Sequence, residues 1–63
     1  MKKTTKLYPE DLASDKMVAI RQILRSTGDN GFCQLTDNND GRAFLTIQAD
    51  DKNKKAIEDI LKK

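Results

Sequence analysis

GFCQLTDNNDGRAFLTIQ, residues 31–48, carries the clearest structural signal in this chain of 63 residues. Its two arms, FCQLT and AFLTIQ, alternate apolar and polar residues with period two, which is typical of half-buried strands. The Asp, Asn and Gly residues between the arms favour left-handed conformations and local side-chain hydrogen bonds, as tight loops require. The stretch therefore predicts a β-hairpin with strands at residues 32–36 and 43–48.

The alternation also divides the side chains of the hairpin between two faces of the predicted sheet. The odd positions are expected to face the core: Cys33, Leu35, Ala43, Leu45 and Ile47. The even positions are expected to face the other way: Phe32, Gln34, Thr36, Phe44, Thr46 and Gln48. Both phenylalanines of the chain thus fall on the side away from the core.

Apolar residues three or four positions apart precede the hairpin and predict an amphipathic helix. They form one stripe: Leu12, Met17, Ile20, Ile23, Leu24 and Thr27. Ser14 or Asp11 is expected to cap the start of this helix, because short polar side chains accept hydrogen bonds from free backbone N–H groups. Gly28 suits the left-handed turn past its end.

A second apolar stripe follows the hairpin, within DDKNKKAIEDILKK at residues 50–63, and predicts another amphipathic helix. Its members are Ala56, Ile57, Ile60 and Leu61, with Asp50 or Asp51 as the expected cap. A short β-prone run, TTKLY at residues 4–8, opens the chain and is ended by Pro9, which cannot donate to a sheet.

The element order is therefore strand, helix, strand, strand, helix. A right-handed crossover through the first helix gives a ferredoxin-like split β-α-β arrangement (βαββα) that lacks its last strand. The fold class is α+β: a three-stranded antiparallel or mixed sheet with both helices on one face. Residues 1–63 are expected to form a single small domain.

Composition excludes several classes of function. The chain has one cysteine and no histidine, so an internal disulfide and a cysteine–histidine zinc site within one chain are excluded. No apolar run is long enough for a signal peptide or a membrane span, and a cytoplasmic location is expected. The net charge of +2 is too small to indicate nucleic-acid binding by itself.

The residues for catalysis or for a cofactor are also missing. An EF-hand calcium loop with Gly41 at its sixth position places Thr36 first and Ile47 twelfth, and neither is the required ligand. Cys33 has no histidine to act as its base and is expected to be a buried apolar residue. We therefore expect no catalytic residue, no metal ligand and no small-molecule cofactor.

The segment LASDKMV, residues 12–18, resembles the metal-binding loop of heavy-metal-associated domains, which share this element order. That family binds a soft metal through two cysteines, and Ser14 and Met17 stand at their places here. The resemblance thus implies a metal-chaperone-like fold that has lost metal binding. Residues 24–48 are also similar to the C-terminal domain of bacterial replicative polymerase alpha subunits, which implies an interaction module.

The even-numbered face is the strongest candidate for a binding site. Its expected residues include all three aromatics of the chain together with polar neighbours: Tyr8, Phe32, Phe44, Lys6, Arg42, Gln34 and Gln48. One hypothesis is a surface for a protein partner or a second copy of the chain. An alternative is single-stranded nucleic acid, with the aromatics stacking on bases and Lys6 and Arg42 on phosphates. A third is that Phe32 and Phe44 only stabilise the hairpin as a cross-strand pair.

Overall fold

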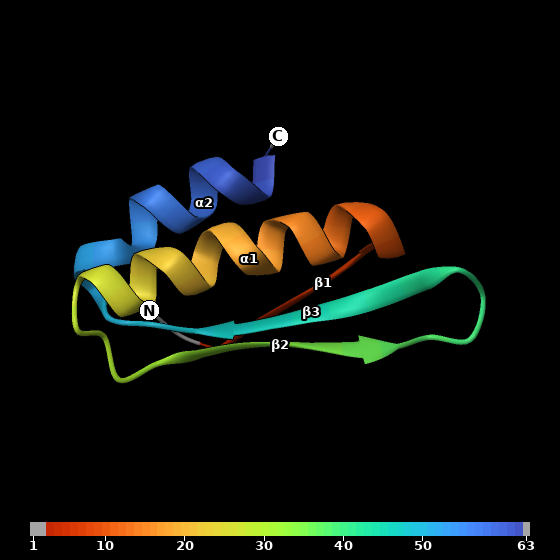
Figure 1. Cartoon of the computed structure of the whole chain (residues 1–63), viewed down its shortest axis with the longest axis horizontal. Coiled ribbons are helices and arrows are strands. Elements are labelled where there is room, and N and C mark those ends of the chain that lie inside the picture. Colours follow the sequence, from red (N-terminus) through yellow and green to blue (C-terminus); the bar gives the residue numbers. More distant parts are fainter. Residues whose placement is uncertain (1–2, 63) are drawn as a thin grey trace.

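The computed structural model describes residues 3–62 of the chain. The elements in order are β1 (Thr4–Pro9), α1 (Glu10–Ser26), β2 (Phe32–Asp37), β3 (Arg42–Gln48), the 3₁₀ turn η1 (Asp51–Asn53) and α2 (Lys54–Lys62) (Figure 1). The predicted α+β class is confirmed, with a three-stranded antiparallel sheet and two helices.

The sheet has the strand order β1-β3-β2, and both neighbouring pairs are antiparallel. Helix α1 therefore carries the chain from one edge of the sheet to the other, and β3 returns between the two edge strands. Both helices lie on the same side of the strands, so the opposite side of the sheet carries no helix among the described residues (Figure 1).

The predicted hairpin joins β2 to β3. The N–H of Asn38 donates to the carbonyl of Arg42 at 3.0 Å, which closes the loop. Asn39 and Gly41 have φ angles of 63° and 84°, the left-handed conformations that Asn and Gly accept most readily. The composition of the loop thus matches the backbone that the turn requires.

The core lies between the sheet and the helices. Its buried members come from every layer: Ile20, Leu24, Cys33, Leu45, Ile47, Ala49 and Ile57. Four of the five odd hairpin positions are buried as predicted, and Leu35 is half-buried. In α2, Ile60 and Leu61 pack against this cluster, but Ala56 is exposed, so its predicted inward position is wrong.

Helix α1 begins earlier than expected and presents a different face to the sheet. Its first residue is Glu10, its N-cap is Pro9, and neither Asp11 nor Ser14 caps it. The buried residues are Ala13, Lys16, Ile20 and Leu24, whereas Leu12 is 47% exposed. The predicted stripe is correct at Ile20 and Leu24, which are buried, and Met17 and Ile23 are half-buried. It is wrong at Leu12 and at Thr27, which is exposed and follows the end of the helix.

The end of α1 is a Schellman motif, in which a left-handed residue reverses the chain. Gly28 has a φ angle of 67° and donates its N–H to the carbonyl of Arg25, and Asp29 donates to the carbonyl of Leu24 at 2.9 Å. The prediction for Gly28 is confirmed.

None of the helices described in residues 3–62 has the length and apolar character needed to cross a membrane.

Candidate functional site

The face of the sheet that the helices leave uncovered is defined by the strand register. Its side chains are those at alternate positions that share a side with Phe44: Thr5, Leu7, Pro9, Phe32, Gln34, Thr36, Arg42, Phe44, Thr46 and Gln48. We call these ten residues the open face. Five of the seven residues predicted for this surface belong to it: Phe32, Phe44, Gln34, Gln48 and Arg42.

Tyr8 and Lys6 do not belong to the open face, and their predicted placement is wrong. Tyr8 pairs with Ala43 and Lys6 pairs with Leu45, and both partners point toward the helices. Leu7 points outward instead, opposite Phe44, and is 37% exposed. The inward-facing and outward-facing positions of β1 are therefore the reverse of those expected.

Contacts with both helices explain why Tyr8 turns inward. Its hydroxyl donates to the carbonyl of Leu61 at 3.1 Å, and the ammonium nitrogen of Lys16 lies 5.1 Å from the ring centroid. Lys16 also donates to the carbonyl of Ile60 at 2.8 Å. The two side chains thus satisfy carbonyls in the last turn of α2, where a positive charge is also favourable. Burial raises the pKa of the Tyr8 hydroxyl.

Phe32 and Phe44 share the open face but do not form a cross-strand pair. Phe32 lies opposite Gln48, whereas Phe44 lies opposite Thr36. Gln48 and Phe44 are four positions apart on β3, which separates the two rows by about 14 Å at the usual rise of a strand. The hypothesis of a stabilising aromatic pair is therefore wrong, and each ring has its own neighbours.

The exposed apolar area of the open face lies at both ends of the sheet. Phe32 is 39% exposed, beside Gln48, and Leu7 lies next to the half-buried Phe44. Between them Thr46 is only 7% exposed, because it is in the central strand with Thr5 and Gln34 on either side. The surface is a row of threonines and glutamines with an apolar group at each end.

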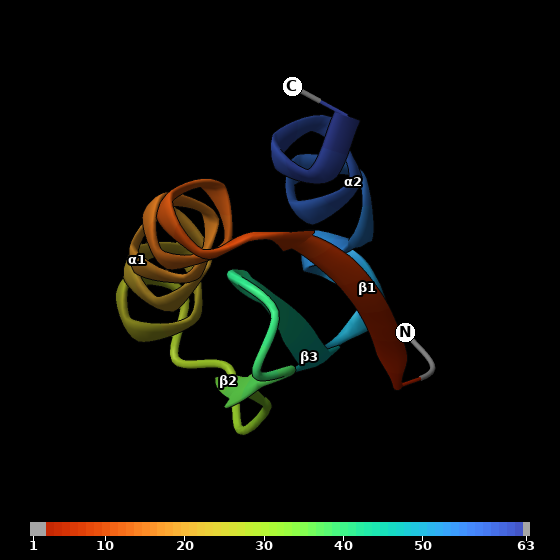
Figure 2. The same cartoon turned by 90° about the vertical axis from the view of Figure 1, so that its right-hand side faces the viewer.

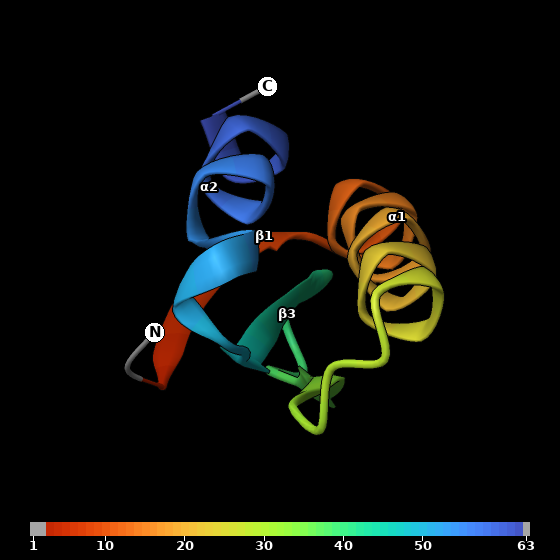
Figure 3. The ribbon, with the colours of Figure 1, turned by 90° about the vertical axis from the view of Figure 1, so that its left-hand side faces the viewer.

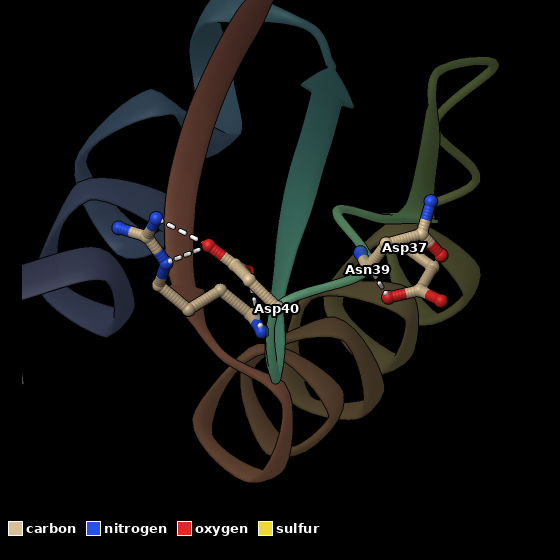
Figure 4. Close-up of polar contacts among 4 residues, drawn as sticks. Asp37, Asn39 and Asp40 are labelled. Carbon is tan, nitrogen blue, oxygen red and sulfur yellow. Dashed lines mark hydrogen bonds and ion pairs between the residues drawn. The ribbon is translucent and has the colours of Figure 1, made fainter.

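Arg42, the only charged residue of the open face, is held by the hairpin loop. Its Nε donates to Asp40 Oδ2 at 2.8 Å, and its Nη2 contacts the same oxygen (Figure 4). The hydrogen bond from Arg42 lowers the pKa of the Asp40 carboxyl. The guanidinium is thus already paired with an anion inside the loop.

The acidic residues of the loop are used by the turn itself. Asp37 Oδ1 accepts the N–H of Asn39 at 3.0 Å, as Figure 4 shows, and Asp40 Oδ1 accepts the N–H of Arg42 at 3.1 Å. Within residues 3–62, no cluster of three or more His, Cys, Asp or Glu residues has an arrangement suited to a metal ion. The loop carboxylates therefore serve as local hydrogen-bond acceptors.

Cys33 is a core residue, as predicted. It is 3% exposed, and burial raises the pKa of its thiol to about 11, although the nearby Arg21 acts in the opposite direction. The side chain of Arg21 donates to the carbonyl of Cys33 at 3.0 Å. At neutral pH the thiol is protonated, which is the unreactive form.

A polar cluster that the sequence pattern does not predict joins the two loops at the other end of the sheet. Asn53, 5% exposed, donates to Thr27 Oγ1 and to Asp29 Oδ2, both at 2.8 Å. Asp29 also accepts the N–H groups of Gly31 and Asp50. A Gly-Asp-Asn-Gly run after a helix was the available local signal, but its partner Asn53 is more than twenty positions away.

Residues 12–18, compared above with a metal-binding loop, are helical throughout. Ser14 is exposed, and Met17 is half-buried against the core. Their side chains are thus presented by the first turns of a helix rather than by a loop.

Comparisons with protein-family models, with curated proteins and with solved structures find no match to this chain.

Proposed function

We propose that this chain is a small, non-enzymatic binding domain whose open face contacts an uncharged surface of another protein. The observation that carries the proposal is the absence of free charge on that face. Of its ten residues only Arg42 is charged, and it is paired with Asp40, in a chain whose composition is 35% charged. Centres of protein interfaces are depleted in charged residues and enriched in aromatic ones.

The size of the open face favours a different protein over a second copy of the chain. Three strands about 4.8 Å apart and six residues long cover about 300 Å², so two such faces would bury about 600 Å² in total. Stable interfaces bury roughly 1,200–2,000 Å². A face-to-face homodimer would therefore be weak. The proposed partner also covers surface beyond the ten residues of the open face, next to Phe32 and Leu7.

The nucleic-acid alternative has less support than it had from the sequence. It depended on three stacking aromatics and two cations on one surface. Tyr8 and Lys6 lie on the helix side, and Arg42 is neutralised by Asp40. Only Phe32 and Phe44 remain, about 14 Å apart.

The same proposal includes the architecture and the location of the domain. The strand order β1-β3-β2 with a crossover through α1 supports a ferredoxin-like arrangement, of which the described residues provide the elements from β1 to α2. A single unpaired cysteine supports a cytoplasmic location, since reduced thiols are the rule there.

The test places a charge on the open face and compares it with the same change elsewhere. Phe32→Lys is matched with Val18→Lys, because Val18 is also an exposed apolar residue, 51% exposed on α1 against 39% for Phe32. Tagged full-length chains are expressed in cells of the source organism, and the co-purified proteins are quantified by mass spectrometry. NMR spectra of both variants check that the core amides are unchanged.

We expect a discrete protein that the unmodified chain and Val18→Lys retain and that Phe32→Lys loses by at least tenfold. Equal retention by both variants would contradict the proposal, as would equal loss. Sedimentation of the purified chain gives the homodimer alternative its own readout: a dimer at micromolar concentration that Phe32→Lys dissociates would replace the proposed partner by a second copy.

A further inference from the structure

The outer edge of β1 is a second surface, distinct from the open face. β1 pairs with β3 on one side only, and it is the outermost strand of the sheet. Figure 2 shows it at the margin of the molecule, with α2 above and no described strand beyond it. Figure 3 shows the same edge from the opposite direction.

Particular backbone groups of β1 point away from the sheet. The N–H of Glu10 donates to the carbonyl of Gly41, directly across from it in the register. Because hydrogen-bonded positions alternate along an antiparallel pair, Thr5 and Leu7 direct their N–H and C=O groups outward. Pro9, which has no N–H, occupies the next outward position, as prolines in edge strands do.

A groove of about 350 Å³ runs beside this edge on the helix side. It is lined by side chains of β1 and α2: Thr4, Lys6, Tyr8, Glu58, Leu61 and Lys62. Two of these lining residues are joined directly, since the Tyr8 hydroxyl donates to the Leu61 carbonyl. A strand placed along β1 would point every second side chain into this space.

The opposite edge of the sheet is less accessible to an added strand. The outward positions of β2 include Cys33, since Asn38 bonds inward to Arg42 across the register. The carbonyl of Cys33 already accepts the side chain of Arg21 from α1. An incoming strand at β2 would have to displace that guanidinium.

The charges around the groove indicate what kind of strand fits. Among residues 3–62, Lys6 and Lys62 line it with a single carboxylate, Glu58, and Tyr8 and Leu61 supply apolar surface. This composition complements a segment with acidic and apolar side chains. It disfavours pairing of β1 with β1 of a second copy, because a lysine within an edge strand opposes such association.

We propose that the outer edge of β1 binds an extended, acidic-apolar peptide segment of another protein, which adds to the sheet as a fourth strand. Its backbone bonds to Thr5 and Leu7, and its alternate side chains enter the groove, with a carboxylate near Lys6. The inference goes beyond the proposed function of the open face, because the groove lies on the helix side of the sheet and the open face lies on the other.

The test titrates the isotopically labelled full chain with an eight-residue synthetic peptide that alternates valine and glutamate. The matched probe replaces each glutamate by lysine. Chemical shifts and amide hydrogen exchange of Thr5 and Leu7 are followed by NMR. Three variants are compared: Lys6→Glu, which reverses the charge; Thr5→Pro, which removes an outward N–H that β3 does not use; and Phe32→Lys, which alters only the open face.

We expect the glutamate peptide to slow exchange at Thr5 and Leu7 by at least tenfold. Lys6→Glu weakens its binding at least fivefold and makes the lysine peptide the better ligand, Thr5→Pro abolishes binding, and Phe32→Lys has no effect. The amides of Leu45 and Ile47 report whether Thr5→Pro is folded; if it is not, Lys6→Glu decides. Absence of binding at millimolar peptide overturns the inference, as do shifts confined to β2 or the open face, or a β1-paired dimer in sedimentation. None of these results depends on whether the open face binds a protein.

Discussion

Replacing Gly31 by alanine is expected to destabilise the domain more than any other change at a glycine. A Cβ at this position would lie 1.8 Å from the carbonyl oxygen of Gln48 and 2.8 Å from the Cα of Ala49. These are main-chain atoms of β3 and its extension, so the clash is relieved only if β2 moves away from its partner. Overpacking typically costs 1–3 kcal/mol, and we expect about 3 kcal/mol here because no flexible side chain yields.

Gly28→Ala provides the matched control. Nothing lies within 4 Å of a Cβ there, and the cost comes only from the positive φ of 67°. That cost is about 1 kcal/mol, since the left-handed penalty is partly offset by the smaller entropy of the unfolded chain. Guanidinium unfolding followed by circular dichroism measures both. A Gly31→Ala variant as stable as Gly28→Ala would refute the close approach of the strands, and with it the register that places Phe32 opposite Gln48.

Three further outcomes follow from buried or hydrogen-bonded groups. Lys16→Met should lower the free energy of unfolding by about 1–2 kcal/mol. The variant no longer has to desolvate an ammonium group, but it loses a charge-assisted hydrogen bond to the Ile60 carbonyl, and the loss is the larger of the two. Lys55→Met, on the exposed side of α2, should change the free energy of unfolding little. At Asp29, partial burial acts to raise the carboxyl pKa, but hydrogen bonds from Asp50, Asn53 and Gly31 outweigh it and lower the pKa. The stability that this lowered pKa adds is present above about pH 4 and is lost as the pH falls through the pKa of the folded state. Asp29→Asn should therefore make the free energy of unfolding less dependent on pH in the acid range. The pKa of Cys33 is raised from 9.0 to about 11, so its thiolate fraction at pH 8 is about 100-fold smaller than in the unfolded chain, and a thiol reagent should modify the folded protein correspondingly more slowly.

The hairpin and its faces follow from local pattern. The odd positions of both arms, residues 32–36 and 43–48, are apolar, and a shift of one residue would turn Leu45 and Ile47 toward solvent. The loop between the strands is rich in Asn, Asp and Gly, which leaves little choice of connection. The pattern therefore predicts correctly that Cys33 is buried and that both phenylalanines face away from the helices.

Which residues of β1 face the helices does not follow from local pattern. TTKLY has no alternation, and hydropathy alone favours Leu7 over Tyr8 as the inward residue. Tyr8 faces inward because its hydroxyl donates to the Leu61 carbonyl and its ring contacts Lys16. Both partners lie on helices elsewhere in the chain. A phenol that buries its ring and keeps its hydroxyl bonded competes well with leucine at such a position.

The buried face of helix α1 does not follow from local pattern either. The apolar stripe predicted from the sequence runs through Leu12 and does not include Lys16. The structure buries Lys16 because the end of α2 offers the carbonyl of Ile60, and the helix is rotated so that Leu12 is exposed. A charged side chain in a hydrophobic stripe gives no local sign that an acceptor lies 44 residues away.

Site-specific photo-crosslinking at the open face tests the central claim most directly. Phe32→benzoylphenylalanine places the reactive group on the face, and Val18→benzoylphenylalanine places it at a comparably exposed position on α1. After irradiation in cells of the source organism, we predict a discrete adduct with another protein from position 32 that is absent from position 18. The same adducts from both positions, or none from position 32, would contradict the account.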